Sequence, residues 1–425
     1  MQRLVSCALI AAVAAIVTAS TPALAEAPQA SAILKTYADI AEATYGDALT
    51  GAKTLRAAVQ GLLDSPSQSS LDKARDAWKA ARVPYMQSEA FRFGNKIVDD
   101  WEGRVNAWPL DEGLIDYVDA KSYGDEKDEN ELYTANVIAN TSIKLGTETV
   151  DATTIDGALI RKLHRAMDTD TAVASGYHAI EFLLWGQDLH GTGKGAGERP
   201  ASDYDLKACT GGHCERRQAY LVAATDLLIS DLSEMADNWK PDGKARQELA
   251  AKGEVGGLSA IVTGLGSLSY GELSGERIKV GALLHDPEEE HDCFSDNTHN
   301  SHFYDQTGIM NVWNAHYQRL DGSVVSGPSI ADLARSKAPD AAKRIDDAFA
   351  TTLGKIKLIK DKADSGEMAY DQMLAAGNEA GTKMVMDAAD ALVAQARALE
   401  AAMPELGLKI ELGESEKLSK MGQTP

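Results

Sequence analysis

Apolar side chains recur every three or four residues along most of the chain, and this spacing predicts helices. In the segment 215–240 they fall on one stripe of a helix surface. The same pattern runs through 33–63, from 71 to about 91, and through two Ala-rich segments at 330–363 and 367–402. No segment shows a convincing alternation of apolar and polar residues, so we expect an all-α fold. The stripe in 215–240 consists of Leu221, Ala224, Leu228, Leu232, Met235 and Trp239.

Polar and Gly-rich segments separate the predicted helices, and one of them lies midway between two sets of helices. This cysteine-containing loop at 206–214 is the expected boundary between domains at 26–205 and 206–425. A faint internal repeat supports the division, because in each half a long apolar helix precedes a helix that ends in Glu and Arg before an acidic turn with proline. We therefore expect two similar helical bundles, packed side by side, with a cleft where polar groups from both halves converge.

The N-terminal residues and the net charge indicate where the protein works and what it avoids. Residues 1–25 have a charged start, an apolar middle and an Ala-x-Ala-like end, which is typical of a cleaved secretory signal peptide. No later run is long and apolar enough to span a bilayer, so we expect a soluble exported protein without a transmembrane segment. The formal charge of −22 disfavours nucleic acid and anionic lipid as partners and favours cations or basic partners.

Three cysteines remain once that segment is removed. Cys209 and Cys214 flank a loop with two glycines that can fold back on itself, and export would place them in an oxidising compartment. We expect a disulfide between them, which leaves Cys293 over. Pairings that involve Cys293 are the alternative.

The stretch SGYHAIEFLLWGQD contains the first pair of candidate functional residues. His178 and Glu181 are three residues apart, hence neighbours on one helical face, and the apolar residues that follow place them near a core. A histidine in such a position is either a structural group with a satisfied hydrogen bond or a ligand. A buried histidine and a buried glutamate each require a partner, and this spacing supplies one.

The stretch 285–302 holds four of the nine histidines in a strongly acidic setting. Asp286 and Pro287 are favourable residues at a helix start, and the glutamates that follow are stabilised there by the helix dipole, so the acids require no metal. The histidines do not follow from that account. His285 and Glu288 repeat the spacing of His178 and Glu181, and imidazole with carboxylate suits zinc or iron better than calcium or magnesium.

A third candidate region consists of the stretches QSEAFRFG and WPLDEG. Glu89 and Arg92 could form an ordinary exposed ion pair that contributes at most about 1 kcal/mol. The aromatic residues around them indicate partial burial instead, so we also consider them, with Asp111, as residues of the cleft.

Several catalytic motifs do not occur in the sequence. It contains no His-Glu-x-x-His of zinc peptidases, only one Glu-x-x-His where a ferritin-like di-iron bundle requires two, no Gly-x-Ser-x-Gly elbow and no phosphate-binding loop. Hydrolysis by a standard mechanism is therefore not indicated.

Taken together, these stretches resemble the imelysin family, and most of all its iron-regulated protein A branch. The resemblance rests on QSEAFRFG, WPLDEG, GYHAIEFLLWG, the cysteine loop with RRQAYL, and the long stretch SYGELSGERIKVGALLHDPEEEHDCFSDNTHNSH. The family motif Gly-x-His-x-x-Glu corresponds to Gly176, His178 and Glu181. The resemblance implies two similar helical bundles, export to the periplasm or the outer-membrane surface, a link to iron uptake, and a proposed peptidase activity.

The leading hypothesis is an exported protein of iron acquisition that binds iron or zinc, or an iron chelate, in the cleft, with other iron-uptake proteins of the cell envelope as further partners. One alternative is a metallopeptidase with zinc held by His and Glu; another is a module that binds a partner or chelate without a bare metal. The expected metal ligands are His178, Glu181, His285 and Glu288, and the expected cleft residues are Glu89, Arg92, Asp111, Glu272 and Arg277.

Overall fold

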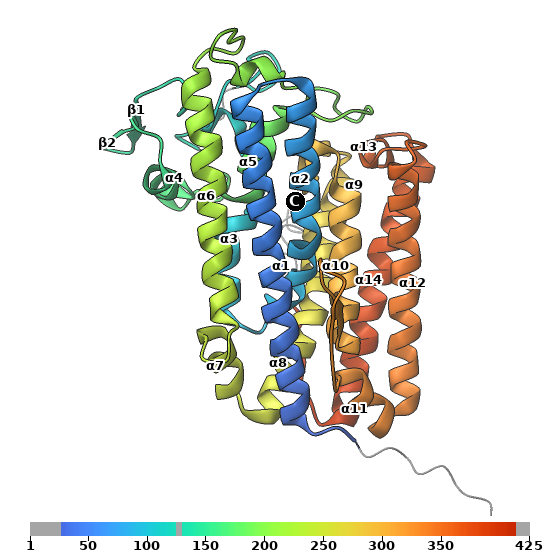
Figure 1. Cartoon of the computed structure of the whole chain (residues 1–425). Coiled ribbons are helices and arrows are strands. Elements are labelled where there is room, and N and C mark those ends of the chain that lie inside the picture. The colour runs from blue at the N-terminus through green and yellow to red at the C-terminus, as the bar shows by residue number, and fades with distance from the viewer. Residues whose placement is uncertain (1–26, 125–129, 414–425) are drawn as a thin grey trace, which may run out of the picture.

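Long helices that run along a common direction form most of the molecule (Figure 1). The computed structural model describes residues 27–124 and 130–413, and the expected signal peptide at 1–25 lies outside them. The chain is 66% helix and 4% strand, so the packing of helices, and not sheet formation, builds the core. This confirms the predicted helical character.

The helices differ greatly in length, from five residues in α9 and α13 to 35 in α1. The helices are α1 (Ala30–Asp64), α2 (Gln68–Ser88), α3 (Lys96–Asn106), α4 (Gly157–Leu163), α5 (Gly176–Trp185), α6 (Cys214–Asn238), α7 (Lys244–Ala251), α8 (Gly253–Ser267), α9 (Val280–Leu284), α10 (Thr298–Asn314), α11 (Ile330–Lys337), α12 (Pro339–Asp364), α13 (Tyr370–Leu374) and α14 (Glu379–Leu406). A π-helical segment, Leu268–Lys279, joins α8 to α9.

Two sets of long helices lie side by side. On one side α1 packs against α2 and α6, and on the other α14 packs against α12 and the π-helical segment (Figure 1). The contact between α2 and α10 joins the sets, and a single continuous cluster of buried apolar residues runs through both. Although α6 follows the predicted boundary near residue 205, it covers faces of α1 and α5. The division into two domains stays a prediction.

The two Ala-rich segments each form two helices where one was expected. The first is divided between Ala338 and Pro339, because proline cannot donate the helical hydrogen bond and disfavours helical backbone in the residue before it. The second is divided at 375–378, where Gly377 has φ of 85° and the side chain of Asn378 accepts a hydrogen bond from the Gly381 amide to cap α14. Local stop and start signals outweigh the apolar pattern at both places.

Two short hairpins interrupt the helical pattern. Strand β1 (Ser142–Leu145) pairs antiparallel with β2 (Glu148–Asp151), and β3 (His316–Gln318) pairs with β4 (Val324–Ser326). Each strand has only three or four residues, which is too short to produce a visible alternation in sequence.

The predicted disulfide is confirmed. Cys209 and Cys214 are bonded with their Cα atoms 5.9 Å apart, and the bond closes the loop just before α6. Cys293 is free and buried.

An aromatic cluster fastens the end of α6 to the first helix. The ring of Trp239, completely buried, lies 5.8 Å from that of Tyr37 in α1 and 5.9 Å from that of Phe91. We expect Trp239→Ala to lower the free energy of unfolding by about 3–5 kcal/mol, because the cavity left in a dense core collapses only in part. Urea unfolding followed by circular dichroism measures the loss. Replacement of the adjacent, exposed Lys240 by alanine is the control and should change stability little; equal losses in the two variants would contradict the packing account.

Candidate functional site

Helix α5, which carries His178 and Glu181, is completely buried and begins at a glycine that its packing requires. Gly176 has φ of 88°, and a Cβ atom on it would lie 2.4 Å from the carbonyl oxygen of Val105 in α3. Glycine alone combines this left-handed backbone with the absence of a side chain. The glycine of the Gly-x-His-x-x-Glu motif thus allows α5 to lie directly against α3.

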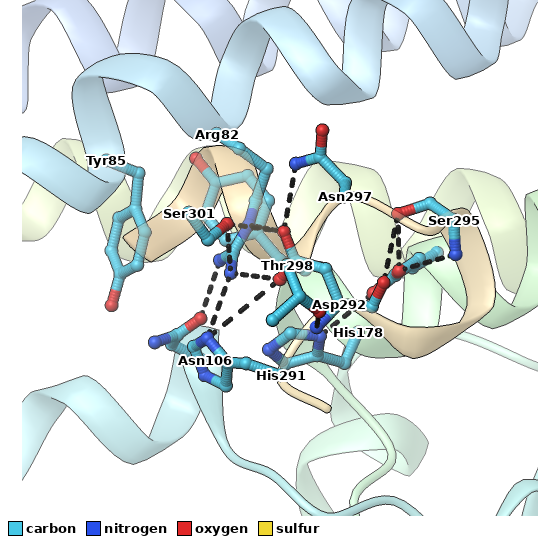
Figure 2. A network of polar contacts seen from close by, with 12 residues as sticks. Arg82, Tyr85, Asn106, His178, His291, Asp292, Ser295, Asn297, Thr298 and Ser301 are labelled. Carbon is cyan, nitrogen blue, oxygen red and sulfur yellow. Dashed lines mark hydrogen bonds and ion pairs between the residues drawn. The ribbon is translucent and has the colours of Figure 1, made fainter. Parts of the chain in front are cut away.

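His178 and Glu181 form a hydrogen-bonded pair inside this core. His178 Nδ1 lies 2.9 Å from Glu181 Oε2, while the other carboxylate oxygen accepts hydrogen bonds from the backbone amide (3.0 Å) and the hydroxyl (2.7 Å) of Ser295 (Figure 2). Burial, together with the guanidinium of Arg82, lowers the pKa of His178 well below its usual range. The ring is therefore neutral, and within the described chain its Nε2 atom has no hydrogen-bond partner.

A second histidine and a carboxylate approach His178 from a distant part of the sequence. His291 and Asp292 lie in the irregular segment between α9 and α10, and one ligand atom from each of His178, His291 and Asp292 lies within 4.8 Å of the other two. The two imidazole rings are 4.8 Å apart between centroids. Burial and the nearby Arg277 lower the pKa of His291 as well, so both rings offer a lone pair.

Asp292 is held by a buried ion pair with Arg82 of α2. Arg82 Nη2 lies 2.5 Å from Asp292 Oδ1, and its Nη1 atom donates to Asn106 Oδ1 at 2.6 Å. The second oxygen of Asp292 accepts from the side chains of Asn297 and Ser301 (Figure 2). Burial disfavours the charged carboxylate, but Arg82 outweighs it and lowers the pKa of Asp292 to about 2. The carboxylate is thus ionised and fixed in place.

A second polar group joins the two sets of helices by reciprocal ion pairs. Arg277 of the π-helical segment contacts Glu89 at 2.5 Å, and Arg92, near Glu89, contacts Glu272 of the π-helical segment at 3.2 Å. Arg277 Nε also donates to Glu272 at 3.0 Å, which fits the spacing of five residues that a π-helix brings to one face. The structure therefore brings together four of the five expected cleft residues.

A cavity of about 510 Å³ opens beside both polar groups. Its walls include Arg92, Glu272 and Arg277 from the reciprocal pairs and His291 from the imidazole pair. Trp108 also lines the cavity, and its ring lies 5.0 Å from the ring of His178. The cavity thus provides an open space against His291.

The remaining predicted residues lie elsewhere among the described residues. Asp111 accepts hydrogen bonds from the side chains of Asn130 and Thr171 and does not line the cavity. His285 and Glu288 are both exposed, and neither belongs to the group around His178. The Nδ1 atom of His285 lies 2.7 Å from the carbonyl oxygen of Leu374. Asp286 caps a helical segment, as the sequence predicts, but this segment is only a single turn long.

The sequence did not lead us to Asp292, Arg82 or Ser295, and His291 was noted only for its spacing of three residues from Glu288, not as a ligand. One signal in the sequence could have indicated that His291 and Asp292 are buried. They come directly after the acidic turn and are followed by Cys-Phe-Ser, and an apolar pair beside polar residues indicates burial. No comparable signal marks Arg82, which lies within a helix that has many charged residues.

The chain is similar to known proteins both in sequence and in fold. A family model described as Imelysin matches residues 41–399, which confirms the resemblance seen in the motifs. Iron-regulated protein A of Synechococcus elongatus is 24% identical over 319 residues, or 72% of this chain and 69% of that protein. The crystal structure of a protein assigned as an iron-regulated protein A precursor, from Parabacteroides distasonis ATCC 8503, matches with a TM-score of 0.61 at 19% identity, over 89% of this chain and 96% of that one. The last comparison shows that the fold is shared.

Within the described residues, the helices are each too short or too polar to traverse a bilayer.

The entry into α5 is held by a partly buried histidine, and its protonation should weaken the fold. His164 Nδ1 accepts from the amides of Ala174 and Ser175, and its Nε2 lies 2.8 Å from the carbonyl oxygen of Gly103. A proton on Nδ1 would break the first two bonds, and burial lowers the pKa of His164 to about 4.

An unfolded chain takes up this proton below about pH 6.5, whereas the folded chain resists it until about pH 4, so stability is lost as the pH falls through this window. The parent protein should therefore lose free energy of unfolding between pH 7 and pH 5. In His164→Gln we expect this loss to be smaller by about 1–2 kcal/mol. Urea unfolding at both pH values, in chelator, measures this difference. The exposed His316 provides the control, since His316→Gln should keep the parent's pH dependence; an unchanged slope in His164→Gln would contradict the assignment.

Proposed function

The chain belongs to the imelysin family, and from this premise we propose that it binds a transition-metal ion, iron or zinc, through His178, His291 and Asp292 beside the cavity. The observation that carries the proposal is the convergence of two neutral imidazoles and an ionised carboxylate within 4.8 Å, in a core where His178 Nε2 has no protein partner among the described residues. Imidazole and carboxylate are ligands of zinc and iron.

Glu181 is best described as a positioning residue in this site. A metal-binding histidine commonly donates its second ring N–H to a carboxylate, which fixes the ring and the tautomer. The contact between His178 Nδ1 and Glu181 matches that arrangement and directs Nε2 away from Glu181. Ser295 in turn holds Glu181 with two hydrogen bonds.

The choice of iron as the physiological ion rests on relatives and on charge. Two similar proteins bear the name iron-regulated protein A, which says that iron regulates them. The net charge of −22, and cavity walls that include Glu102, Glu272, Glu276 and Glu289, favour the approach of a cation. These observations support an iron-related role, with iron as cargo.

Binding accounts for the geometry better than the peptidase alternative. A zinc peptidase needs a carboxylate that is free to act as general base on a metal-bound water. Both oxygens of Glu181 are occupied, one by His178 and the other by Ser295, and Glu288 is exposed away from the imidazole pair.

A ligand larger than a bare ion is the second candidate, and the cavity favours it. A volume of about 510 Å³ lies within the usual range for small-molecule sites, and Arg92, Arg165 and Arg277 on its walls could bind the acidic groups of an iron chelate. In that case His291 would meet the metal of the chelate from one side.

The proposal includes the wider arrangement expected from the sequence. The crosswise pairs of Glu89 with Arg277 and of Arg92 with Glu272 support a duplicated pair of bundles, since each half supplies one acid and one base to the other. Export to the periplasm or the outer-membrane surface, and cooperation with other iron-uptake proteins there, follow as proposals from the sequence.

Removal of the first ligand should abolish tight metal binding. We expect chelator-treated protein to bind Zn²⁺, and Fe²⁺ without oxygen, with an affinity that falls more than about 100-fold in His178→Ala, because even changes to a ligand's hydrogen-bond partner cost 10–100-fold. Isothermal titration gives the affinity, and circular dichroism should show unchanged helix content. The exposed His316→Ala is the matched control; equal affinity in all three proteins would rule out the site.

Glu181→Gln should have a smaller effect than His178→Ala. The amide oxygen of glutamine still accepts from His178 Nδ1 but is a weaker acceptor than a carboxylate oxygen, so we expect affinity to fall by about 10–100-fold while the site persists. The same titrations measure this. A peptidase would be identified instead by cleavage of a protein substrate that both a chelator and Glu181→Gln abolish, and an organic-ligand module by chelate binding that depends on Arg92 while bare ions do not bind.

A further inference from the structure

A second group of carboxylates, separate from the imidazole pair, lies where the loops after α5 and before α10 meet α13. Asp188 follows α5, Asp296 has left-handed backbone (φ 50°) just before α10, and Asp371 lies in α13. One carboxylate oxygen from each lies within 4.8 Å of the other two. Three segments that are far apart in sequence thus converge through side chains of the same charge.

A fourth carboxylate from the same region is completely buried and points toward this group. Glu290 has no exposed surface, and neither of its oxygens has a hydrogen-bond donor in bonding geometry within the described chain, although the Thr298 side chain lies close enough to favour its charged form. The same holds for both oxygens of Asp371, which is 1% exposed, and for one oxygen of Asp296. The Glu290 carboxyl interacts most strongly with Asp371 and then with Asp296.

Lysine and arginine side chains do not compensate these charges. Within the described residues, no Lys or Arg forms an ion pair with Asp188, Asp296, Asp371 or Glu290, and His190 alone contacts Asp188. Lys194 lies in the same loop as Asp188, but its ammonium group donates to the carbonyl oxygen of Gly366. Burial and the neighbouring acids raise the pKa of Asp296 to about 7. Either protons or a bound cation must relieve such repulsion.

We propose that Asp188, Asp296, Asp371 and Glu290 form a site for a hard divalent cation, Ca²⁺, that clasps the three loop segments together. The donor set contains only carboxylate oxygens, which calcium prefers and which suit iron or zinc less well than the imidazole pair does. Oxygens on opposite sides of Ca²⁺ are about 4.6–5.2 Å apart, close to the observed spread, whereas Mg²⁺ requires a tighter octahedron.

The site would act on the neighbouring imidazole pair through the backbone. Glu290 and Asp296 flank the segment that contains His291, Asp292 and Ser295, so a cation bound at both ends of this segment fixes the residues between them. The inference is independent of the proposed function, because the cation site uses none of the residues that would bind iron or zinc.

Calcium titration of the chelator-treated full chain tests the proposal. We expect a single Ca²⁺ ion to bind by isothermal titration, and the melting temperature to rise by a few degrees in excess calcium. Asp371→Asn and Glu290→Gln should each weaken calcium binding at least about tenfold, since each removes one charge from the donor set. In EDTA, the variants should be at least as stable as the parent because they relieve repulsion.

Two control variants separate this site from other acids and from the imidazole pair. Asp76→Asn, at an exposed position on α2, should retain full calcium binding, as should His178→Ala, in which only the iron or zinc site is removed. Absence of calcium binding by the parent at about 1 mM, well within the range of extracellular calcium sites, would overturn the proposal and leave protons as the means of neutralisation. Calcium affinity unchanged in both Asp371→Asn and Glu290→Gln, or equally tight Mg²⁺ binding, would overturn it as well.

Discussion

The centre of the molecule depends on one buried ion pair, between Arg82 and Asp292. Arg82 is 1% exposed and Asp292 completely buried, so both charges have lost their hydration. Such a pair contributes little net stability, yet removal of one partner typically costs about 3–5 kcal/mol because the other charge is left uncompensated. The pair therefore acts mainly by fixing position: it ties the irregular segment before α10 to the middle of α2. Ser295, three residues further on, then holds Glu181, and Glu181 orients His178.

Two kinds of buried or partly buried carboxylate occur in this structure, and they differ in how their charge is balanced. Glu89, which is buried, and Glu272, which is partly buried, contact arginines from the opposite set of helices, and Arg92 and Arg277 lower the pKa of Glu272 to about 2. Asp371 and Glu290 have no such partners among the described residues. The carboxylates paired with arginine join helices at all times. The unpaired carboxylates can join loops only when protons or a cation from solution balance their charge.

The sequence predicted the long helices well and the residues of the candidate site only in part. Segments 33–63 and 215–240 form single helices close to the predicted bounds, because a long apolar stripe leaves one face to bury. The pairing of His178 with Glu181 also followed from helical spacing. His291 and Asp292 could not be placed in this way, since they lie in an irregular segment whose path is set by a tertiary ion pair. The choice of His285 and Glu288 assumed a helix that continues past Pro287, whereas the chain makes one turn there and then bends inward.

The continuous apolar core limits how this protein can be divided. A fragment that ended at residue 205 would uncover the faces of α1 and α5 that α6 occupies, and it would separate Arg82 from Asp292 and Glu89 from Arg277. If the two halves arose by duplication of an ancestral bundle, that ancestor needed a different means of covering these faces, such as pairing with an identical copy. In the present chain the segments on either side of residue 205 depend on each other, because each completes the interior of the other.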